Sequence, residues 1–135
     1  MKKSILILIL FVVGCLALKS SNVFATERFK VGVIAPLSGV LAEYGLAAQN
    51  GIELALSQDP KLFNNIEFVY EDSQWDAKTS VSAFNRLKDS EKVSIVFNWG
   101  NPTSEAIAPI AEQSKLPLIG MTLDPRVARG KNYII

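Results

Sequence analysis

Residues 29–56 place a short apolar run directly before a long amphipathic segment, and this pairing constrains the fold more than any other part of the chain. The run FKVGVIA is short and rich in β-branched residues, which is typical of a strand buried in a parallel sheet, and a loop from Pro36 to Gly39 interrupts it. In the segment that follows, apolar residues recur at helical spacing and share one face: Tyr44, Ala48, Ile52 and Ala55. A strand that enters a helix through such a loop can present backbone donors to a ligand.

The remaining sequence repeats this alternation of strand and helix. The patterns predict strands over residues 66–71, 93–97, 117–120 and 133–135, and helices over residues 77–88 and 103–113. Asp76 is placed to cap the first of these helices, whereas Pro109 predicts a kink or break in the second. Gly45 and Gly51 are expected to let the helix after the first strand pack closely on the sheet. The alternation predicts an α/β fold with a parallel sheet covered on both faces.

The first 25 residues have the features of an export signal. Lys2 and Lys3 precede an apolar run over residues 5–18, and the segment ends in the small-x-small sequence Val23, Phe24, Ala25. The run is too short for a membrane-spanning helix. We therefore expect a signal peptide over residues 1–25 and a periplasmic protein from residue 26. In an alternative interpretation, Val-Val-Gly-Cys is similar to a lipobox, and Cys15 would anchor the protein through a lipid.

Composition narrows the function classes. Without residues 1–25 the chain has 11 basic and 13 acidic residues, a net charge of −2, which gives no indication of a nucleic-acid partner. It contains no histidine, and its single cysteine lies in the predicted signal peptide. Disulfides and the commonest metal and general-base chemistry are therefore not expected, which argues against an enzyme. Glu71, Asp72 and Asp76 suggest a hard-cation site, but a solvated loop and a helix cap explain them, so we expect neither metal nor cofactor.

Several sequence segments carry a family resemblance. These are VGVIAPLSG, LAEYG and AAQNGIELA between Val31 and Ala55, and APIAEQSKLPLIG over residues 108–120. From residue 29 to 135 the chain resembles the N-terminus of the type I periplasmic binding proteins, in the branched-chain amino acid group of receptors for ABC importers. The resemblance implies an open parallel sheet flanked by helices with strand order 2-1-3-4-5. It also implies that residues 26–135 are an incomplete N-terminal lobe of a two-lobe protein.

The search for a binding site narrows to four loops. In an open parallel sheet the ligand crevice lies beyond the carboxyl ends of the strands, where strand order reverses. The loops at that edge are residues 36–44, 72–76, 98–104 and 120–124. With the implied strand order, the loop ending at Tyr44 and the loop beginning at Asn98 should face each other.

The loop over residues 98–104 has the most specific chemistry. We predict Asn101 as the N-cap of a helix and Pro102 as its first residue, which leaves the amides of Thr103 and Ser104 without intrahelical partners. Free amides at the positive end of a helix form an anion site, and a solute carboxylate could also bind the hydroxyls of Thr103 or Ser104. Alternatively, Asn101 only caps the helix. The resemblance implies ligand-carboxylate binding here, with Asn101 at the main hydroxyl position.

Other candidate ligand contacts come from the neighbouring loops. The resemblance places Tyr44 against the ligand side chain, although a core residue of the first helical turn is an equal alternative. It also implies that Thr122 lies in the region that holds a ligand ammonium. Asp124 could pair with a cationic group or form a turn before proline. Together with the large ring of Trp99 at the rim, these features make an aromatic or amide ligand an alternative to an aliphatic amino acid. Trp75 could reach the crevice or the partner lobe, but we expect it to pack.

The combined interpretation is an exported binding protein. It would capture a small polar solute, such as an amino acid or a related carboxylate or amide, and deliver it to the membrane permease of an ABC importer, closing by a hinge motion. We expect no catalytic residues and a monomer. A ligand-sensing receptor subunit with the same fold is the main alternative. An exported α/β enzyme is a further one, although residues 35–39 lack the G-x-G-x-x-G pattern of dinucleotide sites.

Overall fold

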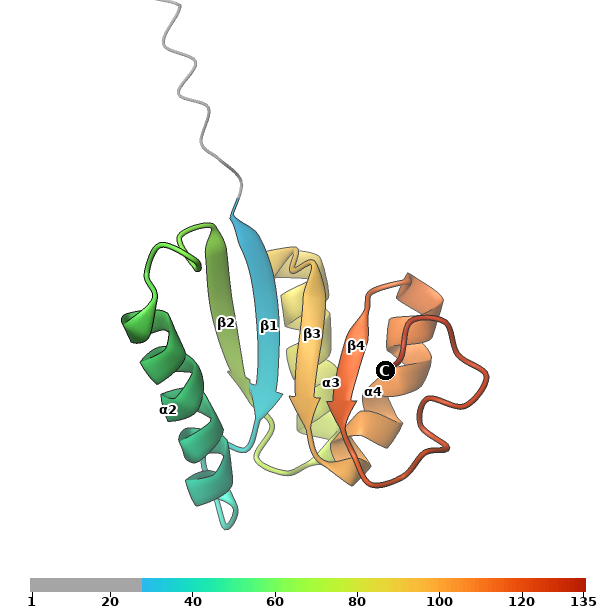
Figure 1. Cartoon of the computed structure of the whole chain (residues 1–135). Helices are drawn as coiled ribbons and strands as arrows, with labels where there is room; N and C mark the ends of the chain where they lie inside the picture. Colours follow the sequence, from blue (N-terminus) through green and yellow to red (C-terminus); the bar gives the residue numbers. More distant parts are fainter. Residues whose placement is uncertain (1–27) are drawn as a thin grey trace, which may run out of the picture.

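The computed structural model describes residues 28–135, so the predicted signal peptide and Cys15 lie outside the described residues. Four parallel strands form one sheet in the order β2-β1-β3-β4 (Figure 1). The strands are β1 (Phe29–Ala35), β2 (Ile66–Asp72), β3 (Ile95–Trp99) and β4 (Leu118–Met121). The predicted α/β class and the predicted order of these four strands are confirmed.

The predicted fifth strand takes its expected place as a single bridge. Ile134 pairs in parallel with Leu118 on the outer side of β4. The amide of Leu118 donates to the carbonyl of Tyr133 at 2.8 Å, and the amide of Gly120 donates to the carbonyl of Ile135 at 2.9 Å. The last residues of the chain therefore continue the sheet in the order 2-1-3-4-5.

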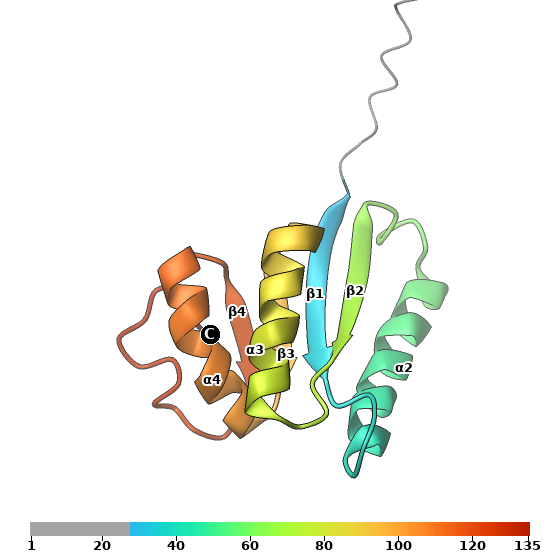
Figure 2. The ribbon, with the colours of Figure 1, turned by 180° about the vertical axis from the view of Figure 1, so that it is seen from behind.

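Helices cover the two faces of the sheet unequally. Helix α2 (Ala42–Gln58) lies on one face, and α3 (Ala77–Arg86), a π-helical turn η1 (Leu87–Glu91) and α4 (Asn101–Ser114) lie on the other (Figures 1 and 2). The main core is formed between the sheet and the α3/α4 side by fully buried side chains: Ile34, Phe84, Leu87, Val96, Ile107, Ala111 and Leu118. This sealed face fixes the positions of the loops at the carboxyl ends of β1, β3 and β4.

Two sequence predictions about helices α3 and α4 have different outcomes. Asp76 is the N-cap of α3, as predicted, and its Oδ1 accepts a hydrogen bond from the amide of Thr79 at 2.7 Å. The predicted break at Pro109 is wrong, because α4 continues to Ser114. Pro109 lies on the exposed face of α4, while Ile107 and Ala111 are fully buried against the core. Burial of that inner face stabilises the helix against the lost backbone hydrogen bond.

Helix α2 packs more loosely than predicted. A Cβ at Gly45 would lie 2.0 Å from the carbonyl oxygen of Pro36, so this glycine allows contact with the β1–α2 loop. A Cβ at Gly51 would meet nothing within 4 Å, so the prediction of close packing there is wrong. An apolar groove of about 430 Å³ separates α2 from the sheet, with Ile52 and Phe97 among its lining residues.

Within residues 28–135, none of the helices combines the length and the apolar character that crossing a bilayer requires.

Candidate functional site

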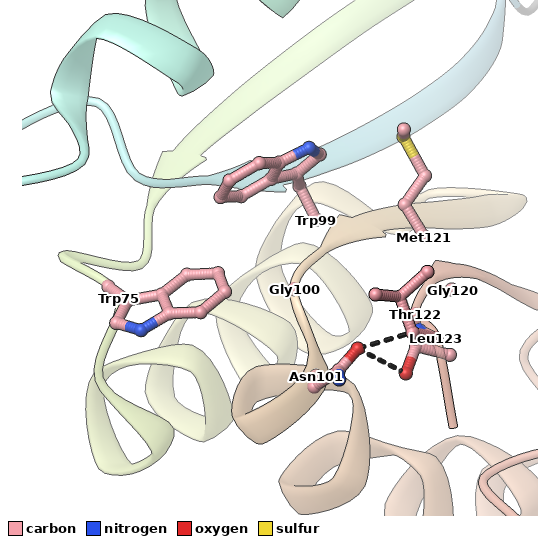
Figure 3. Close-up of a pocket in the computed structure, with 8 residues that line it drawn as sticks. All are labelled: Trp75, Trp99, Gly100, Asn101, Gly120, Met121, Thr122 and Leu123. Carbon is pink, nitrogen blue, oxygen red and sulfur yellow. Dashed lines mark hydrogen bonds between the residues drawn. The ribbon is translucent and has the colours of Figure 1, made fainter.

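A hollow of about 580 Å³ opens at the carboxyl edge of the sheet (Figure 3). Three of the four predicted loops, residues 72–76, 98–104 and 120–124, supply its walls. The remaining loop ends at Tyr44, whose ring stacks on Trp99. The lining residues are Trp75, Trp99, Gly100, Asn101, Gly120, Met121, Thr122 and Leu123. The site therefore lies where strand topology predicts a ligand crevice.

Aromatic rings from three separate loops meet beside this hollow. The rings of Tyr44 and Trp99 stack with centroids 5.7 Å apart and an interplanar angle of 14°. The rings of Trp75 and Trp99 lie 5.1 Å apart at 54°. The loop that ends at Tyr44 thus faces the loop that begins at Asn98, as the strand order predicts. Tyr44 is half-exposed in the first turn of α2 and supports Trp99 rather than lining the hollow.

Trp75 reaches the hollow because its loop adopts an uncommon backbone conformation. Gln74 and Trp75 both have positive φ, 50° and 59°. The amide of Gln74 donates to Oδ1 of Asp72 at 2.9 Å, and the amide of Trp75 donates to Oγ of Ser73 at 3.2 Å. Local side-chain acceptors therefore hold a conformation that L-residues rarely adopt. Trp75 was expected to pack, with contact to the crevice as the alternative, and its ring both packs on Gly100 and lines the hollow.

Asp72 connects the end of β2 to the loop after β1. Its Oδ1 accepts hydrogen bonds from the amides of Leu37 at 2.8 Å and Ser38 at 3.3 Å, and its Oδ2 accepts from the Ser38 hydroxyl. Burial raises the pKa of Asp72, but the bonds from the Ser38 hydroxyl and from the amides of Gln74, Leu37 and Ser38 lower that pKa below its usual value. Asp72 therefore organises two loops.

Within residues 28–135 no cluster of three acidic, histidine or cysteine side chains could hold a metal ion.

Helix α4 begins one residue earlier than predicted. Gly100, with φ of 123°, is the N-cap, and Asn101 is already helical, so the prediction of Asn101 as N-cap is wrong. The amide of Ser104 donates to the carbonyl of Gly100 at 3.0 Å and is therefore not free, contrary to the prediction. Asn101 is partly exposed and lines the hollow at the open end of the helix, where the first backbone amides have no intrahelical partner and the helix dipole is positive.

The hydroxyls of Thr103 and Ser104 point into the protein. Both residues are fully buried, and the side-chain amide of Asn98 donates to Oγ1 of Thr103 at 3.0 Å and to Oγ of Ser104 at 2.7 Å. The Thr103 hydroxyl in turn donates to the carbonyl oxygens of Trp99 and Gly100, each at 3.1 Å. These contacts fix the turn from β3 into α4. They leave neither hydroxyl facing the hollow, in contrast to the ligand contact expected from the sequence.

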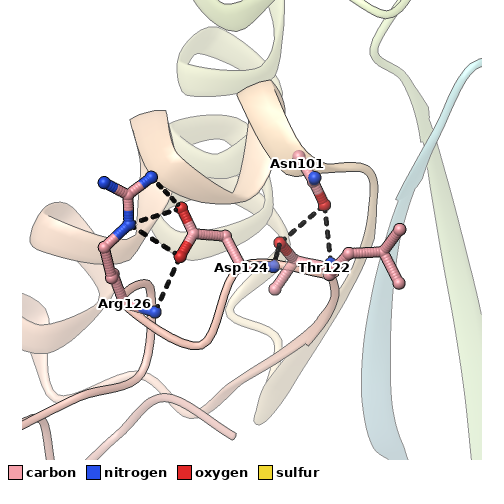
Figure 4. Close-up of polar contacts among 5 residues, drawn as sticks. Asn101, Thr122, Asp124 and Arg126 are labelled. Atoms are coloured by element: carbon pink, nitrogen blue, oxygen red, sulfur yellow. Dashed lines mark hydrogen bonds and ion pairs between the residues drawn. The ribbon is translucent and has the colours of Figure 1, made fainter.

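Asn101 joins α4 to the loop after β4 (Figure 4). Its side-chain oxygen accepts hydrogen bonds from the Thr122 hydroxyl and the Leu123 amide, both at 2.7 Å. The Thr122 oxygen also accepts from the amide of Asp124 at 3.1 Å. Asn101 and Thr122, two predicted ligand contacts, therefore bind each other and together form one wall of the hollow.

The carboxylate of Asp124 forms an ion pair with Arg126 in the same loop. Both of its oxygens accept from Nε of Arg126 at 2.9 Å, and its Oδ1 also accepts from the Arg126 amide. These hydrogen bonds lower the pKa of Asp124 to about 2. Asp124 does not line the hollow and acts as a turn-forming residue, which was the alternative interpretation of the sequence.

Comparison with known sequences matches residues 28–134 to the family described as "Periplasmic binding protein". This chain belongs to the periplasmic binding protein family. That membership agrees with the prediction of binding rather than catalysis, and with the resemblance described above.

Individual periplasmic binding proteins are similar at moderate identity. The Leu/Ile/Val-binding protein of Escherichia coli is 26% identical over 128 residues, covering 90% of this chain and 35% of the relative. Among solved structures, a leucine-binding protein from Thermotoga maritima is 30% identical with a TM-score of 0.71, covering 78% of this chain and 31% of that protein. This chain therefore spans about a third of the length of its relatives.

Two further similar structures contain bound solutes. A solute-binding protein of an ABC transporter from Rhodopseudomonas palustris, in complex with 3,4-dihydroxybenzoic acid, is 26% identical with a TM-score of 0.73, covering 81% of this chain and 31% of that one. A branched-chain amino acid transporter substrate-binding protein from Streptococcus pneumoniae, in complex with isoleucine, has the same identity and TM-score, covering 81% and 33%. The fold of this chain is thus that of ABC-transporter solute-binding proteins.

Proposed function

We propose that residues 26–135 form the N-terminal lobe of an extracytoplasmic receptor that captures a small solute and delivers it to an ABC importer. The observation that carries this proposal is the hollow at the carboxyl edge of the sheet, which the start of α4 and the two tryptophans line. A second lobe would close over this hollow by a hinge motion and complete the binding site. The relatives are about three times as long as the matched segment, which supports a two-lobe protein.

The proposed solute carries a carboxylate or an amide oxygen that faces the start of α4. The donors there are the backbone amide of Asn101 and its side-chain NH₂ group, because the side-chain oxygen is already bound to Thr122 and Leu123. The positive end of the α4 dipole adds to the attraction for an anion. Trp99 supplies an apolar surface for the rest of the solute, with Tyr44 packed behind it.

The other predicted site residues take supporting roles in this proposal. Thr103 and Ser104 hold the turn through Asn98, and Thr122 orients the side-chain amide of Asn101. Asp124 shapes the loop that carries Thr122. Each of these residues would affect binding by positioning a wall of the hollow, without a direct contact to the solute.

The proposed partners follow from this role. They are the solute and the membrane permease of an ABC importer, with the receptor acting as a monomer in the periplasm. Membership in the periplasmic binding protein family supports a location outside the cytoplasm. Export through residues 1–25, or lipid anchoring at Cys15, completes the proposal.

A thermal-shift screen of the full-length protein tests the receptor proposal. The panel contains aliphatic amino acids, aromatic carboxylates and small amides, with cationic amines as the negative set. A solute that binds only the native state at about 100 times its Kd stabilises the protein by about 2.7 kcal/mol, which gives a rise of several degrees in Tm. If no carboxylate or amide raises the Tm, the receptor proposal is wrong, and conversion of one of them to product would indicate an enzyme instead.

A pair of asparagine variants connects a positive result to this hollow. Asn101→Leu removes the polar groups at the start of α4, and Asn65→Leu makes the same change at an exposed position just before β2, at the opposite edge of the sheet. We expect the thermal shift to disappear in Asn101→Leu and to persist in Asn65→Leu. Equal shifts in both variants would place the binding site elsewhere.

A further inference from the structure

The hollow has an aromatic corner as its most distinctive feature. Trp75 and Trp99 meet at 54° with ring centroids 5.1 Å apart, and both line the hollow from different loops (Figure 3). Both residues remain partly exposed, so a flat molecule could contact one indole face and meet the edge of the other. Offset-stacked and edge-to-face arrangements are both favoured for aromatic pairs.

The backbone around Trp75 holds its ring at this corner. Trp75 has φ of 59° directly after Gln74 at 50°, and hydrogen bonds to Asp72 and Ser73 maintain this conformation. On the other side of the ring, Gly100 leaves the space that the indole fills, because a Cβ there would lie 2.2 Å from the ring. Strained backbone of this kind persists where the surrounding structure enforces it, and it is enriched at ligand sites.

The polar groups at the corner are unequally available. Thr122 donates its hydroxyl hydrogen to Asn101, and the carboxylate of Asp124 is held by Arg126. The carbonyl of Met121 accepts from the amide of Gly100 at 3.1 Å. Among residues 28–135, by contrast, the side-chain NH₂ of Asn101 has no hydrogen-bond acceptor. This wall therefore offers a donor without an acceptor to a solute oxygen, whereas each of these acceptors already takes part in a hydrogen bond or an ion pair and is less available to an ammonium group.

We infer that the solute is an aromatic carboxylate without an α-ammonium group, with its ring in the corner between Trp75 and Trp99 and its carboxylate directed to Asn101. This inference rests on the proposed receptor function and specifies the class of solute for the same site. The ring gains contact with the face of one indole and the edge of the other, and the carboxylate gains a donor and the positive end of α4.

A matched set of solutes on the full-length protein tests this inference. Benzoate and cyclohexanecarboxylate carry the same acid on a six-membered ring, but only benzoate has a π face. Phenylalanine and leucine add the ammonium group, with and without an aromatic ring. We expect isothermal titration calorimetry to give benzoate at least about fivefold higher affinity than cyclohexanecarboxylate, and higher affinity than either amino acid.

Variants of the corner give a second readout. Trp75→Leu and Trp99→Leu should each reduce benzoate affinity about fivefold and leave cyclohexanecarboxylate affinity within about twofold. The control is Phe29→Leu, since Phe29 is a half-exposed ring at the start of β1, at the opposite edge of the sheet. That variant should bind both acids like the unaltered protein. The comparison of solutes on the unaltered protein decides the question even if a tryptophan variant does not fold.

The outcomes distinguish failure of the aromatic inference from failure of the receptor proposal. Equal affinity for benzoate and cyclohexanecarboxylate would overturn the aromatic inference and keep the receptor proposal. Tighter binding of leucine or phenylalanine than of benzoate would also overturn it, because the ammonium group would then be recognised. Binding of none of the four, with amides and other acids also inactive in the thermal-shift screen, would overturn the receptor proposal itself.

Discussion

The indole ring of Trp75 lies so close to Gly100 that a Cβ at position 100 would come within 2.2 Å of the ring. Gly100 also has φ of 123°, which side chains other than glycine rarely adopt. We therefore predict that Gly100→Ala destabilises the protein by about 1 to 3 kcal/mol and displaces the Trp75 ring from the hollow. Urea denaturation measures the first effect and tryptophan fluorescence the second.

Gly51→Ala is the matched control for this prediction. A Cβ at Gly51 meets nothing within 4 Å, and the residue lies inside helix α2. Alanine there should leave the stability unchanged or raise it by up to about 1 kcal/mol, because glycine is a poor helix former. Equal effects of the two substitutions would contradict the close approach of Trp75 to Gly100.

Asn101→Asp separates the two roles of the Asn101 side chain. The aspartate keeps an oxygen for Thr122 and Leu123, and a negative charge in the first turn of a helix is favourable, so stability should change by less than about 0.5 kcal/mol. The same charge replaces the NH₂ donor and repels a carboxylate. We expect carboxylate affinity measured by calorimetry to fall at least about tenfold, or about 1.4 kcal/mol. Unchanged affinity would show that the solute does not approach Asn101.

Thr103→Val tests the buried polar network beneath the hollow. Valine has nearly the same shape but leaves one side-chain NH of Asn98 without its acceptor, in a fully buried position. The expected cost is about 1 to 3 kcal/mol in the free energy of unfolding. Thr79→Val is the control, since the Thr79 hydroxyl binds Asp76 at the surface and its loss should cost no more than about 0.5 kcal/mol. A Thr103→Val protein as stable as the parent would rule out this network as a structural element.

Asp72 makes the stability of the hollow's outer loops dependent on pH. Its folded pKa is lower than its usual value, so its carboxylate stabilises the fold above about pH 4, and this contribution is lost as the pH falls through the folded pKa. Asp72→Asn should cost about 1 kcal/mol at pH 7 and make the loss of stability between pH 4 and more acidic values shallower. Denaturation midpoints measured across this range provide the test. An Asp72→Asn protein with the parent's stability at pH 7 and the parent's decline in acid would contradict this role of Asp72.

Much of the fold could be predicted from the sequence because its strands and helices are locally encoded. The β-branched runs that became β1 and β2, and the Asp76 cap, depend on residues that are neighbours in the chain. The predicted break at Pro109 was wrong for the opposite reason. Whether a helix continues through proline depends on the burial of its other face, here by Ile107 and Ala111, which the local sequence does not reveal.

The candidate site was less predictable because long-range contacts define it. The Asn-Pro pair is a favoured helix start, but Asn101 binds Thr122, 21 residues away, and the cap falls to Gly100. The burial of the Thr103 hydroxyl likewise depends on the hydrogen bond that it accepts from the side chain of Asn98. The position of Trp75 had one local signal, an aspartate and a serine three and two residues before it that can stabilise a tight turn. The edge of the sheet could be predicted from topology, but the direction of each side chain could not.

The groove beneath α2 gives the two faces of this lobe different resistance to local opening. Few apolar contacts hold α2 on the sheet, so its amides should exchange with deuterium faster than those of α3 and α4, which are sealed against the core. Tyr44 in its first turn stacks on Trp99, so each opening of α2 removes the support behind a wall of the hollow. A solute that packs against Trp99 would therefore also slow deuterium uptake along α2. Amide exchange in α2, a helix that the solute does not contact, would then report that the solute is bound.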